Sequence, residues 1–215
     1  MPESKKSDTE GSSAARWDKR YRAAAAPPFG TAPNDYLRMV LARADFAAAS
    51  ALCLADGDGR NGRWLAEQGL AVTAVDVSAV ATERAEAFDL ARGVSVERVT
   101  ADLAAWSPAP GRTWQAVFVI YLQGTAALRR RALETAAAAL APGGWLVVEG
   151  FSKAQAERAD MGPDDAGRLY DLAEIEAACP GLEIVEALTG RVRLDEGPRH
   201  RGIAQIVRFA ARRAE

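Results

Sequence analysis

The order of β-like and helical segments constrains the fold of this chain more than any other feature. Between residues 51 and 149, apolar runs with β character alternate with helical patterns, and the runs cover residues 51–55, 72–77, 94–100, 114–122 and 145–149. Parallel strands need a crossover of a dozen or more residues, usually a helix, between one strand and the next. The alternation therefore predicts an α/β protein with a Rossmann-like, doubly wound sheet that is mostly parallel.

The end of the chain follows a different pattern. Two long β-like runs, residues 182–194 and 202–210, are separated only by residues 195–201, and so short a loop has no room for a crossover helix. The last two strands are therefore predicted to form an antiparallel hairpin, which completes a seven-stranded sheet. A length of 215 residues fits one domain with a tail, and the polar residues 1–13 are predicted to be a disordered leader.

Charge and cysteine content exclude several classes of protein. The chain has 27 Lys and Arg against 29 Asp and Glu and no long basic stripe, so nucleic acid is not an expected partner. The basic run at residues 129–131 is interpreted as a solvated helix face. No apolar stretch reaches the roughly 18 residues of a membrane span, and no signal-peptide core is found, which favours a cytoplasmic protein. Cys53 and Cys179 lack CxxC or histidine neighbours, which predicts buried thiols and no metal site.

A glycine-rich turn follows the first predicted strand. Gly57, Gly59 and Gly62 fit the pattern GxGxxG and lead directly into a helix. Glycines let the backbone approach a ligand closely, and the free amides of a helix start can face it. On these residues alone, a plain tight turn is about as probable as a nucleoside site.

Two acidic residues at later strand ends favour the nucleoside site. Asp76 ends the second strand, 17 residues after Gly59, where a carboxylate can accept both hydroxyl hydrogens of a ribose. A helix-capping role is the alternative, but Ser78 already supplies a cap. Asp102 ends the third strand and can accept a hydrogen bond from the exocyclic amine of adenine, or equally well form a local Asx-turn.

Several motifs together resemble those of a known family. The runs LCLADGDGRN, GLAVTAVDVS, VTADL and LAPGGWLVVEGF resemble the successive motifs of class I S-adenosylmethionine-dependent methyltransferases, especially the small bacterial TehB-like and thiopurine-methyltransferase-like branch. The segments WDKRY, at residues 17–21, and GTAPN, at residues 30–34, are similar to the opening of that branch. LDEG at residues 194–197, followed by His200 and Gly202, is similar to its closing hairpin.

The resemblance implies a domain organisation and a cofactor. Residues 14–215 would form one methyltransferase domain, with a cap or lid at 14–48, a cofactor-binding half at 49–151 and a C-terminal helix and hairpin at 152–215. The cofactor would be S-adenosylmethionine, with S-adenosylhomocysteine as product. Its expected binding residues, from the methionine end to adenine, are Ala55, Gly57, Gly59, Asn61, Asp76, Val77, Asp102 and Leu103. Arg20 is a further candidate, for the methionine carboxylate.

Two positions depart from the family pattern. Cys53 stands where an acid is usual in the first strand, and Asp56 or Asp58 would then have to hold the amino group of the donor. Gln115 stands where an Asp is usual early in the fourth strand, which would remove a carboxylate from the reacting end. Neither change affects the glycine turn or Asp76.

The methyl acceptor is expected to be a small molecule, such as a thiol, an oxyanion like tellurite or selenite, or another metabolite. Residues expected at the same sheet edge are Tyr121, Gln123 and Phe151 and, if the sixth strand is parallel to the others, Arg193, Asp195, Glu196 and His200. Tyr121 and His200 are the catalytic candidates. His200 could deprotonate the acceptor near neutral pH, or be a solvated hairpin residue. Trp17 and Tyr21 could form a lid or pin a terminal segment to the core.

Two other functions remain open at this stage. GxGxxG with a downstream acid is also the fingerprint of a nicotinamide-dependent oxidoreductase, although Asp102 and the closing hairpin disfavour it. A protein that binds S-adenosylmethionine without transferring methyl, as a sensor or scaffold, is the alternative suggested by Cys53 and Gln115. The sequence carries no signal for the oligomeric state.

Overall fold

The structure is a computed structural model that describes residues 12–157, 161–163 and 165–215. Most of the predicted leader, residues 1–11, lies outside the described residues. The boundary predicted at residue 13 is wrong, because Ser13 already begins helix α1 (Ser13–Ala23). The hydroxyl of Ser12 caps that helix by accepting a hydrogen bond from the Ala15 amide.

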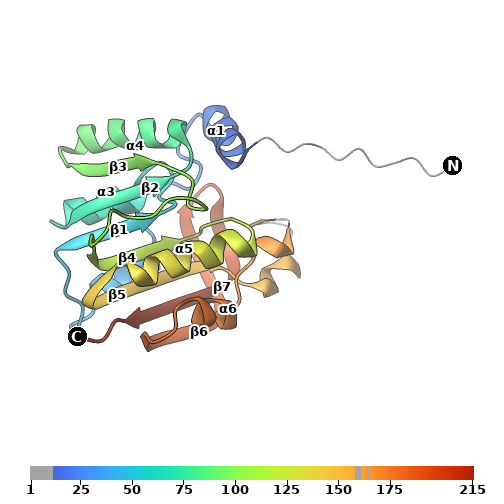
Figure 1. The fold of residues 1–215 in the computed structure, drawn as a ribbon. Coiled ribbons are helices and arrows are strands. Elements are labelled where there is room, and N and C mark those ends of the chain that lie inside the picture. The colour runs from blue at the N-terminus through green and yellow to red at the C-terminus, as the bar shows by residue number, and fades with distance from the viewer. Residues whose placement is uncertain (1–11, 158–160, 164) are drawn as a thin grey trace.

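A seven-stranded sheet forms the centre of the domain (Figure 1). In chain order its strands are β1 (Ser50–Leu54), β2 (Ala71–Asp76), β3 (Val96–Thr100), β4 (Trp114–Ile120), β5 (Leu140–Phe151), β6 (Glu183–Gly197) and β7 (His200–Arg212). They lie in the spatial order β3-β2-β1-β4-β5-β7-β6. The first five are parallel, and β7 runs antiparallel to both of its neighbours. The predicted fold class and closing hairpin are confirmed.

Helices cover both faces of the sheet, as expected for a doubly wound fold. The helices after α1 are α2 (Asp35–Leu41), α3 (Arg60–Glu67), α4 (Ala79–Arg92), α5 (Ala126–Ala138) and α6 (Leu172–Ala178), with 3-10 turns η1 (Lys153–Glu157) and η2 (Ala166–Arg168). Helices α2 and α3 pack Leu37 and Leu65 into the core of one face. Helices α5 and α6 pack Leu133 and Ile175 into the core of the other face.

Side-chain alternation along β1 explains why this strand is central. Ala51 and Cys53 belong to the core under α2 and α3, whereas Leu52 and Leu54 belong to the core under α5 and α6. All four are at most 2% exposed. A strand that is apolar on both faces can be stable only between two helical layers.

Local signals in the sequence place most helix ends correctly. The hydroxyls of Ser78 and Thr125 accept hydrogen bonds from the amides three residues later, at 3.1 and 3.3 Å, and so cap α4 and α5. Gly93 ends α4 in the left-handed region with φ of +67°. Helix α6 begins at Leu172, because the Asp171 side chain accepts a hydrogen bond from the Ala173 amide and caps it.

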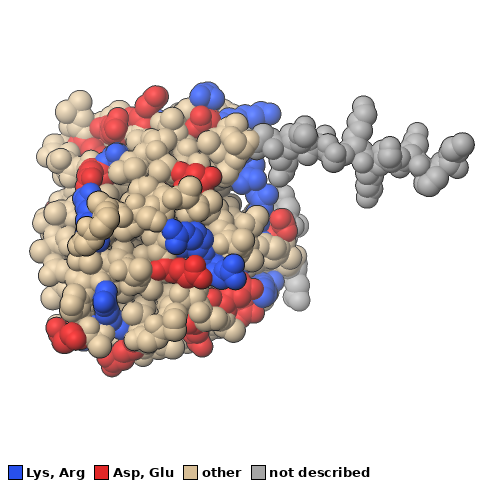
Figure 2. All heavy atoms as spheres, in the orientation of Figure 1, with Lys and Arg blue, Asp and Glu red and all other residues tan. Residues whose placement is uncertain are grey.

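The interpretation of residues 129–131 as a solvated face is wrong for Arg129. Its side chain is 3% exposed and donates hydrogen bonds to the carbonyls of Gly124 and Gly167 and to the carboxylate of Glu174. It therefore ties α5 to the segment before α6. Over the face of the molecule seen in Figure 2, acidic and basic side chains are otherwise interspersed.

The topology fixes where a ligand can bind. Strand order reverses between β1 and β4, and ligands of such sheets bind beyond the carboxyl ends of the strands at this point. Because β7 is antiparallel to β5 and to β6, strand β6 runs in the same direction as the first five. The turn between β6 and β7 therefore emerges at the same edge. Within the described residues, no helix is long and apolar enough to cross a membrane.

Candidate functional site

A cavity lies at this edge, beyond the ends of β1, β2 and β4. It contains about 800 Å³ of space not filled by atoms, its open mouth included. The structure brings nine of the predicted site residues together in its lining, namely Ala55, Gly57, Asn61, Asp76, Val77, Asp102, Leu103, Tyr121 and His200. Gly59 and Arg20 are not among the lining residues.

The glycine turn shapes the floor of the cavity. Gly57 has φ of +59°, and a Cβ atom built there would lie 2.4 Å from the hydroxyl of Tyr21. Gly59 has φ of +87°, and its Cβ would lie 2.6 Å from the Arg98 guanidinium and 2.7 Å from Ala85. Gly57 therefore gives the turn its close approach to the cavity, whereas Gly59 serves the packing beneath it.

Asp76 stands in the wall of the cavity at the end of β2. Its Oδ2 accepts a hydrogen bond from the Gly57 amide at 2.8 Å and its Oδ1 one from the Ser78 amide at 2.9 Å. Burial raises the pKa of Asp76 to about 6, although these two amides act against the shift. Because each carboxylate oxygen can accept more than one hydrogen bond, the amides fix the carboxylate and leave acceptor capacity for a ligand.

Asp102 combines the two roles between which the sequence could not decide. Its Oδ1 accepts a hydrogen bond from the Ala104 amide at 2.9 Å, which is the Asx-turn geometry. The same residue and the buried Leu103 also line the cavity. The turn therefore fixes the side chain at the cavity wall.

The two acids of the turn after β1 have different roles. Asp56 is occupied, since it forms a buried ion pair of 2.7 Å with Arg98 and accepts a hydrogen bond from the Gly62 amide. Asp58 lines the cavity, and its buried Oδ2 has no hydrogen-bond partner among the described residues. Burial, followed by the charge of Asp56, raises the pKa of Asp58 to about 6. Of the two candidates for binding a donor amino group, Asp58 is the one available.

Asp58→Asn is expected to stabilise the protein at neutral pH. The folded pKa of about 6 lies above the ordinary value of 3.8, so ionised Asp58 destabilises the fold above pH 6 by about 1–3 kcal/mol, and this cost decreases as the pH falls from 6 towards 3.8. Thermal unfolding at pH 7.5 and pH 5 should therefore show a higher Tm for the variant at both pH values, with the larger increase at pH 7.5. The control Asp56→Asn breaks the pair with Arg98 and should lower Tm. An unchanged or lower Tm for Asp58→Asn at pH 7.5 would contradict this account.

Helix α1 covers the cavity. Ser13, Trp17 and Tyr21 follow one another at four-residue intervals, so they share one helix face, and all three line the cavity. Asp18 holds the helix in place, because its carboxylate accepts hydrogen bonds from the Ser78 hydroxyl at 2.6 Å and the Val80 amide at 3.3 Å. The structure therefore places both aromatic side chains in the lining of the cavity.

The two departures from the family pattern lie away from the cavity. Cys53 is 2% exposed in the core beneath α2 and α3. Gln115 lies near the start of β4, where its side chain accepts a hydrogen bond from the Ala49 amide at 2.6 Å. The expectation that Gln115 removes a carboxylate from the reacting end is wrong, because the start of a parallel strand lies at the opposite sheet edge.

Aromatic rings enclose His200 in the lining of the cavity. Its ring centroid lies 4.3 Å from that of Tyr121, 5.2 Å from Phe29 and 5.5 Å from Phe151. Its side chain is 2% exposed, so the interpretation as a solvated hairpin residue is wrong. Burial lowers the pKa of His200, while the nearby Glu196 acts in the opposite direction. The imidazole is therefore neutral at pH 7 and able to accept a proton.

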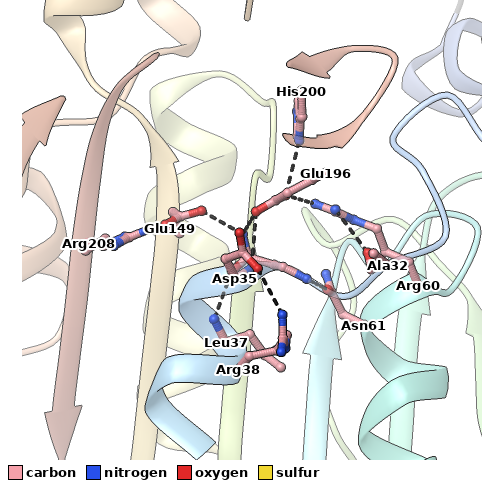
Figure 3. A network of polar contacts seen from close by, with 11 residues as sticks. Ala32, Asp35, Leu37, Arg38, Arg60, Asn61, Glu149, Glu196, His200 and Arg208 are labelled. Atoms are coloured by element: carbon pink, nitrogen blue, oxygen red, sulfur yellow. Dashed lines mark hydrogen bonds and ion pairs between the residues drawn. The ribbon is translucent and has the colours of Figure 1, made fainter. Parts of the chain in front are cut away.

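A buried network of polar side chains lies next to His200 (Figure 3). Asn34, which caps α2 through its Oδ1, donates from Nδ2 to Glu149 at 2.7 Å and to Glu196 at 2.8 Å. The second oxygen of Glu196 lies 2.8 Å from Arg60 and 3.6 Å from the Nδ1 of His200. The network thus joins the segment before α2, helix α3 and the closing hairpin.

The two carboxylates of this network differ in pKa. Burial raises the pKa of Glu149, although Arg208 at 2.6 Å acts against the shift. Burial would also raise that of Glu196, but His200, Arg60 and the Asp35 amide together lower it to about 2. Glu196 is thus a fixed negative charge next to the imidazole of His200.

The sequence analysis missed part of this arrangement. Glu196 was expected at the cavity mouth and lies in the network, whereas Arg193 and Asp195 are exposed and line neither this cavity nor its neighbour. No individual role was predicted for Asn34, Glu149, Arg60 or Phe29, although the first three lie in motifs that resemble the family, because only the fold brings their four segments together. Arg20 stacks on the Trp17 ring at 4.8 Å and lines a neighbouring cavity.

Comparisons with known proteins agree with this architecture. Residues 51–144 match the protein family described as a methyltransferase domain, whereas a search of curated proteins finds no match. One similar solved structure concerns the conversion of a disulfide bond into a thioacetal group during echinomycin biosynthesis. It aligns with a TM-score of 0.73 and 20% identity over 94% of this chain and 91% of that one.

Two further solved structures align with most of this chain. The N-methyltransferase NodS from Bradyrhizobium japonicum WM9, in complex with S-adenosylhomocysteine, aligns with a TM-score of 0.63 and 20% identity over 83% of this chain and 84% of that one. TehB from Haemophilus influenzae aligns with a TM-score of 0.66 and 14% identity over 93% of this chain and 66% of that one, which is consistent with the TehB-like motifs. Residues 51–144 thus match a methyltransferase domain, and the whole chain has the Rossmann-like fold of these solved structures.

Proposed function

We propose that this protein binds S-adenosylmethionine in the cavity under α1 and transfers its methyl group to a small-molecule acceptor. The observation that carries the proposal is the convergence of Asp58, Asp76 and Asp102 on one cavity, at the ends of three different segments. An adenosyl amino acid presents an ammonium group, two ribose hydroxyls and an adenine amine, and each of these is a donor that a carboxylate can bind.

The residues present fit that group. Asp58 offers a buried oxygen without a partner to the ammonium. The carboxylate of Asp76, held by two backbone amides, can accept from the ribose, and Asp102 with Leu103 lies where adenine would be read. Gly57 lines the cavity, and its lack of a side chain lets the Tyr21 hydroxyl pack against the turn.

When bound, S-adenosylmethionine supplies a methyl group already activated by its sulfonium. The residues of this chain then have to align a nucleophile in line with the methyl carbon and exclude water, and such positioning can lower a barrier by about 7 kcal/mol or more. Trp17 and Tyr21 on α1 close the cavity against solvent. His200, neutral and enclosed by aromatic rings, is placed to accept the proton that a hydroxyl, thiol or amine acceptor loses.

Asp76→Ala tests cofactor binding directly. We expect the Kd for S-adenosylhomocysteine, measured by isothermal titration calorimetry at pH 7.5, to rise about 10- to 100-fold, because hydrogen bonds to a charged acceptor are each worth about 1.5–3 kcal/mol. The exposed Asp195→Ala is the matched control and should bind like the wild type. Binding of NAD instead of S-adenosylhomocysteine would support an oxidoreductase, and unchanged affinity in Asp76→Ala would refute the proposed site.

The pH dependence of binding gives a second test of the same site. Asp58 and Asp76 both have a pKa of about 6, and only their ionised forms accept hydrogen bonds through both oxygens. Wild-type affinity for S-adenosylhomocysteine should therefore fall as the pH decreases below 6. Asp58→Asn should weaken binding at pH 7.5 and make the remaining affinity less dependent on pH. An affinity that is constant between pH 5 and 7.5 would contradict these roles.

A measurement of turnover distinguishes an enzyme from a scaffold that only binds the cofactor. S-adenosylhomocysteine release can be screened with thiols, tellurite, selenite, and small hydroxyl, amine and carboxyl compounds. Release that depends on an acceptor supports the enzyme, whereas binding of S-adenosylhomocysteine without turnover on any class would favour a sensor or scaffold.

A further inference from the structure

A second cavity adjoins the first one at the same sheet edge. It contains about 1250 Å³ of space not filled by atoms, its mouth included. Trp17, Phe29, Gln123 and His200 line both cavities. The two cavities therefore meet at the aromatic side chains and the histidine of the proposed acceptor side.

Arginines from three separate segments line the second cavity. Arg16 and Arg20 come from α1, Arg168 from η2 and Arg199 from the turn between β6 and β7. Among the described lining residues one side chain is acidic, Asp165, and it pairs with Arg168 at 3.3 Å. Among the described lining residues, four arginines thus stand against one acid, in contrast to the net charge of −2 of the whole chain.

These guanidinium groups are close enough to affect one another. Burial, followed by the charges of Arg199 and Arg16 and, more weakly, Arg168, lowers the pKa of Arg20. Like charges held together raise the energy of the protein, and a bound anion removes that cost. Guanidinium groups also match the planar oxygen pairs of carboxylate and phosphate.

We propose that the second cavity binds the anionic group of the methyl acceptor, and that the acceptor is a small organic anion bearing a carboxylate or phosphate. This inference rests on the proposed methyltransferase function, because it assigns the acceptor side of the same site. The anion is held by Arg20, Arg168 and Arg199, and the nucleophile lies beside His200, where the two cavities meet.

The transfer step balances without any further reagent. A lone pair of the nucleophile forms the new bond to the methyl carbon, and the electron pair of the breaking carbon–sulfur bond stays on sulfur, which becomes a neutral thioether. The proton of the nucleophile goes to His200 and then to water. The anionic group is not consumed, so it serves for positioning alone.

Matched acceptor pairs test the charge preference. Suitable pairs are 4-mercaptobenzoate with 4-mercaptobenzamide and 4-hydroxybenzoate with 4-hydroxybenzamide. Selenite is added to distinguish an inorganic oxyanion. We expect the kcat/KM of the anionic member to exceed that of its neutral partner by about 10-fold or more, and the advantage to shrink at high salt.

Arginine variants assign the preference to this cavity. Arg199→Ala and Arg20→Ala/Arg199→Ala should lose the preference for anions, with S-adenosylhomocysteine affinity changed less than about threefold. The control Arg130→Ala/Arg191→Ala removes two exposed arginines that line neither cavity and should keep the preference. A preference for neutral or cationic acceptors, or for selenite alone, would overturn the proposal, as would an anion preference that survives the loss of Arg20 and Arg199.

If none of these acceptors reacts, direct measurements of anion binding test the proposal instead. Benzoate and inorganic phosphate are then titrated into the protein saturated with S-adenosylhomocysteine. Binding that is weakened in Arg20→Ala/Arg199→Ala supports the proposal, and no binding of either anion overturns it. Failure to bind S-adenosylhomocysteine would instead refute the proposed function itself, so the two failures are distinguishable.

Discussion

Replacing Asn34 with alanine is expected to lower the free energy of unfolding by about 3–4 kcal/mol. The side chain is 0% exposed and does three things at once, since it caps α2 and donates to the buried carboxylates of Glu149 and Glu196. Loss of a cap costs about 1 kcal/mol, and each buried acceptor left without its donor costs about 1–3 kcal/mol. For a domain of this size, Tm should fall by roughly 10 °C in a thermal unfolding experiment.

Two further variants separate capping from the carboxylate contacts. Thr125→Ala removes an exposed cap, that of α5, and should cost only about 1 kcal/mol. Asn34→Asp keeps a capping oxygen but places a third carboxylate beside Glu149 and Glu196. It should destabilise the protein at neutral pH and recover as the pH falls and a carboxyl group becomes protonated. Equal losses for Asn34→Ala and Thr125→Ala would show that the network adds nothing.

Local chemistry explains why so much of the fold could be predicted from the sequence. The strands buried on both faces are continuous apolar runs, and Ser78, Gly93 and Thr125 mark helix ends by bonds that span a few residues. Arg129 was misjudged because its partners are the carbonyls of Gly124 and Gly167 and a carboxylate on α6. Two of these three lie 38 and 45 residues away, and no pattern within α5 indicates them.

The same contrast between local and long-range contacts determines which residues of the candidate site could be predicted. Ala55, Gly57, Asp76 and Asp102 were predictable because each ends a parallel strand, and parallel strands end at one sheet edge. Glu149 also lies near that edge. Its role in the network depends on its contact with Asn34, which is 115 residues away in the sequence. The arginines of the second cavity are likewise dispersed over positions 16 to 199, so a search for a basic run does not detect them.

His200 provides the largest expected effect on catalysis. His200→Phe keeps an aromatic ring packed against Tyr121, Phe29 and Phe151 but removes the basic nitrogen. With a hydroxyl, thiol or amine acceptor that turns over in the screen, we expect kcat to fall about 10²- to 10⁴-fold, with little change in the Kd for S-adenosylhomocysteine. A kcat within threefold of the wild type would show that no base acts at this position.

The titration of His200 can be followed by NMR without an acceptor, because it is the only histidine in the chain and its two carbon-bound ring protons are the only imidazole signals. Burial lowers its pKa below the ordinary 6.5, and Glu196 partly restores it while Arg60 lowers it further. Glu196→Gln should therefore lower the pKa of His200 again, and the pH at which kcat falls on acidification should move down with it. If Glu196→Gln lowers the pKa of His200 but leaves the pH profile of kcat unchanged, the charge of Glu196 affects the imidazole without affecting the reaction. A parallel shift of the two would instead identify Glu196 as a positioning residue that sets the basicity of His200.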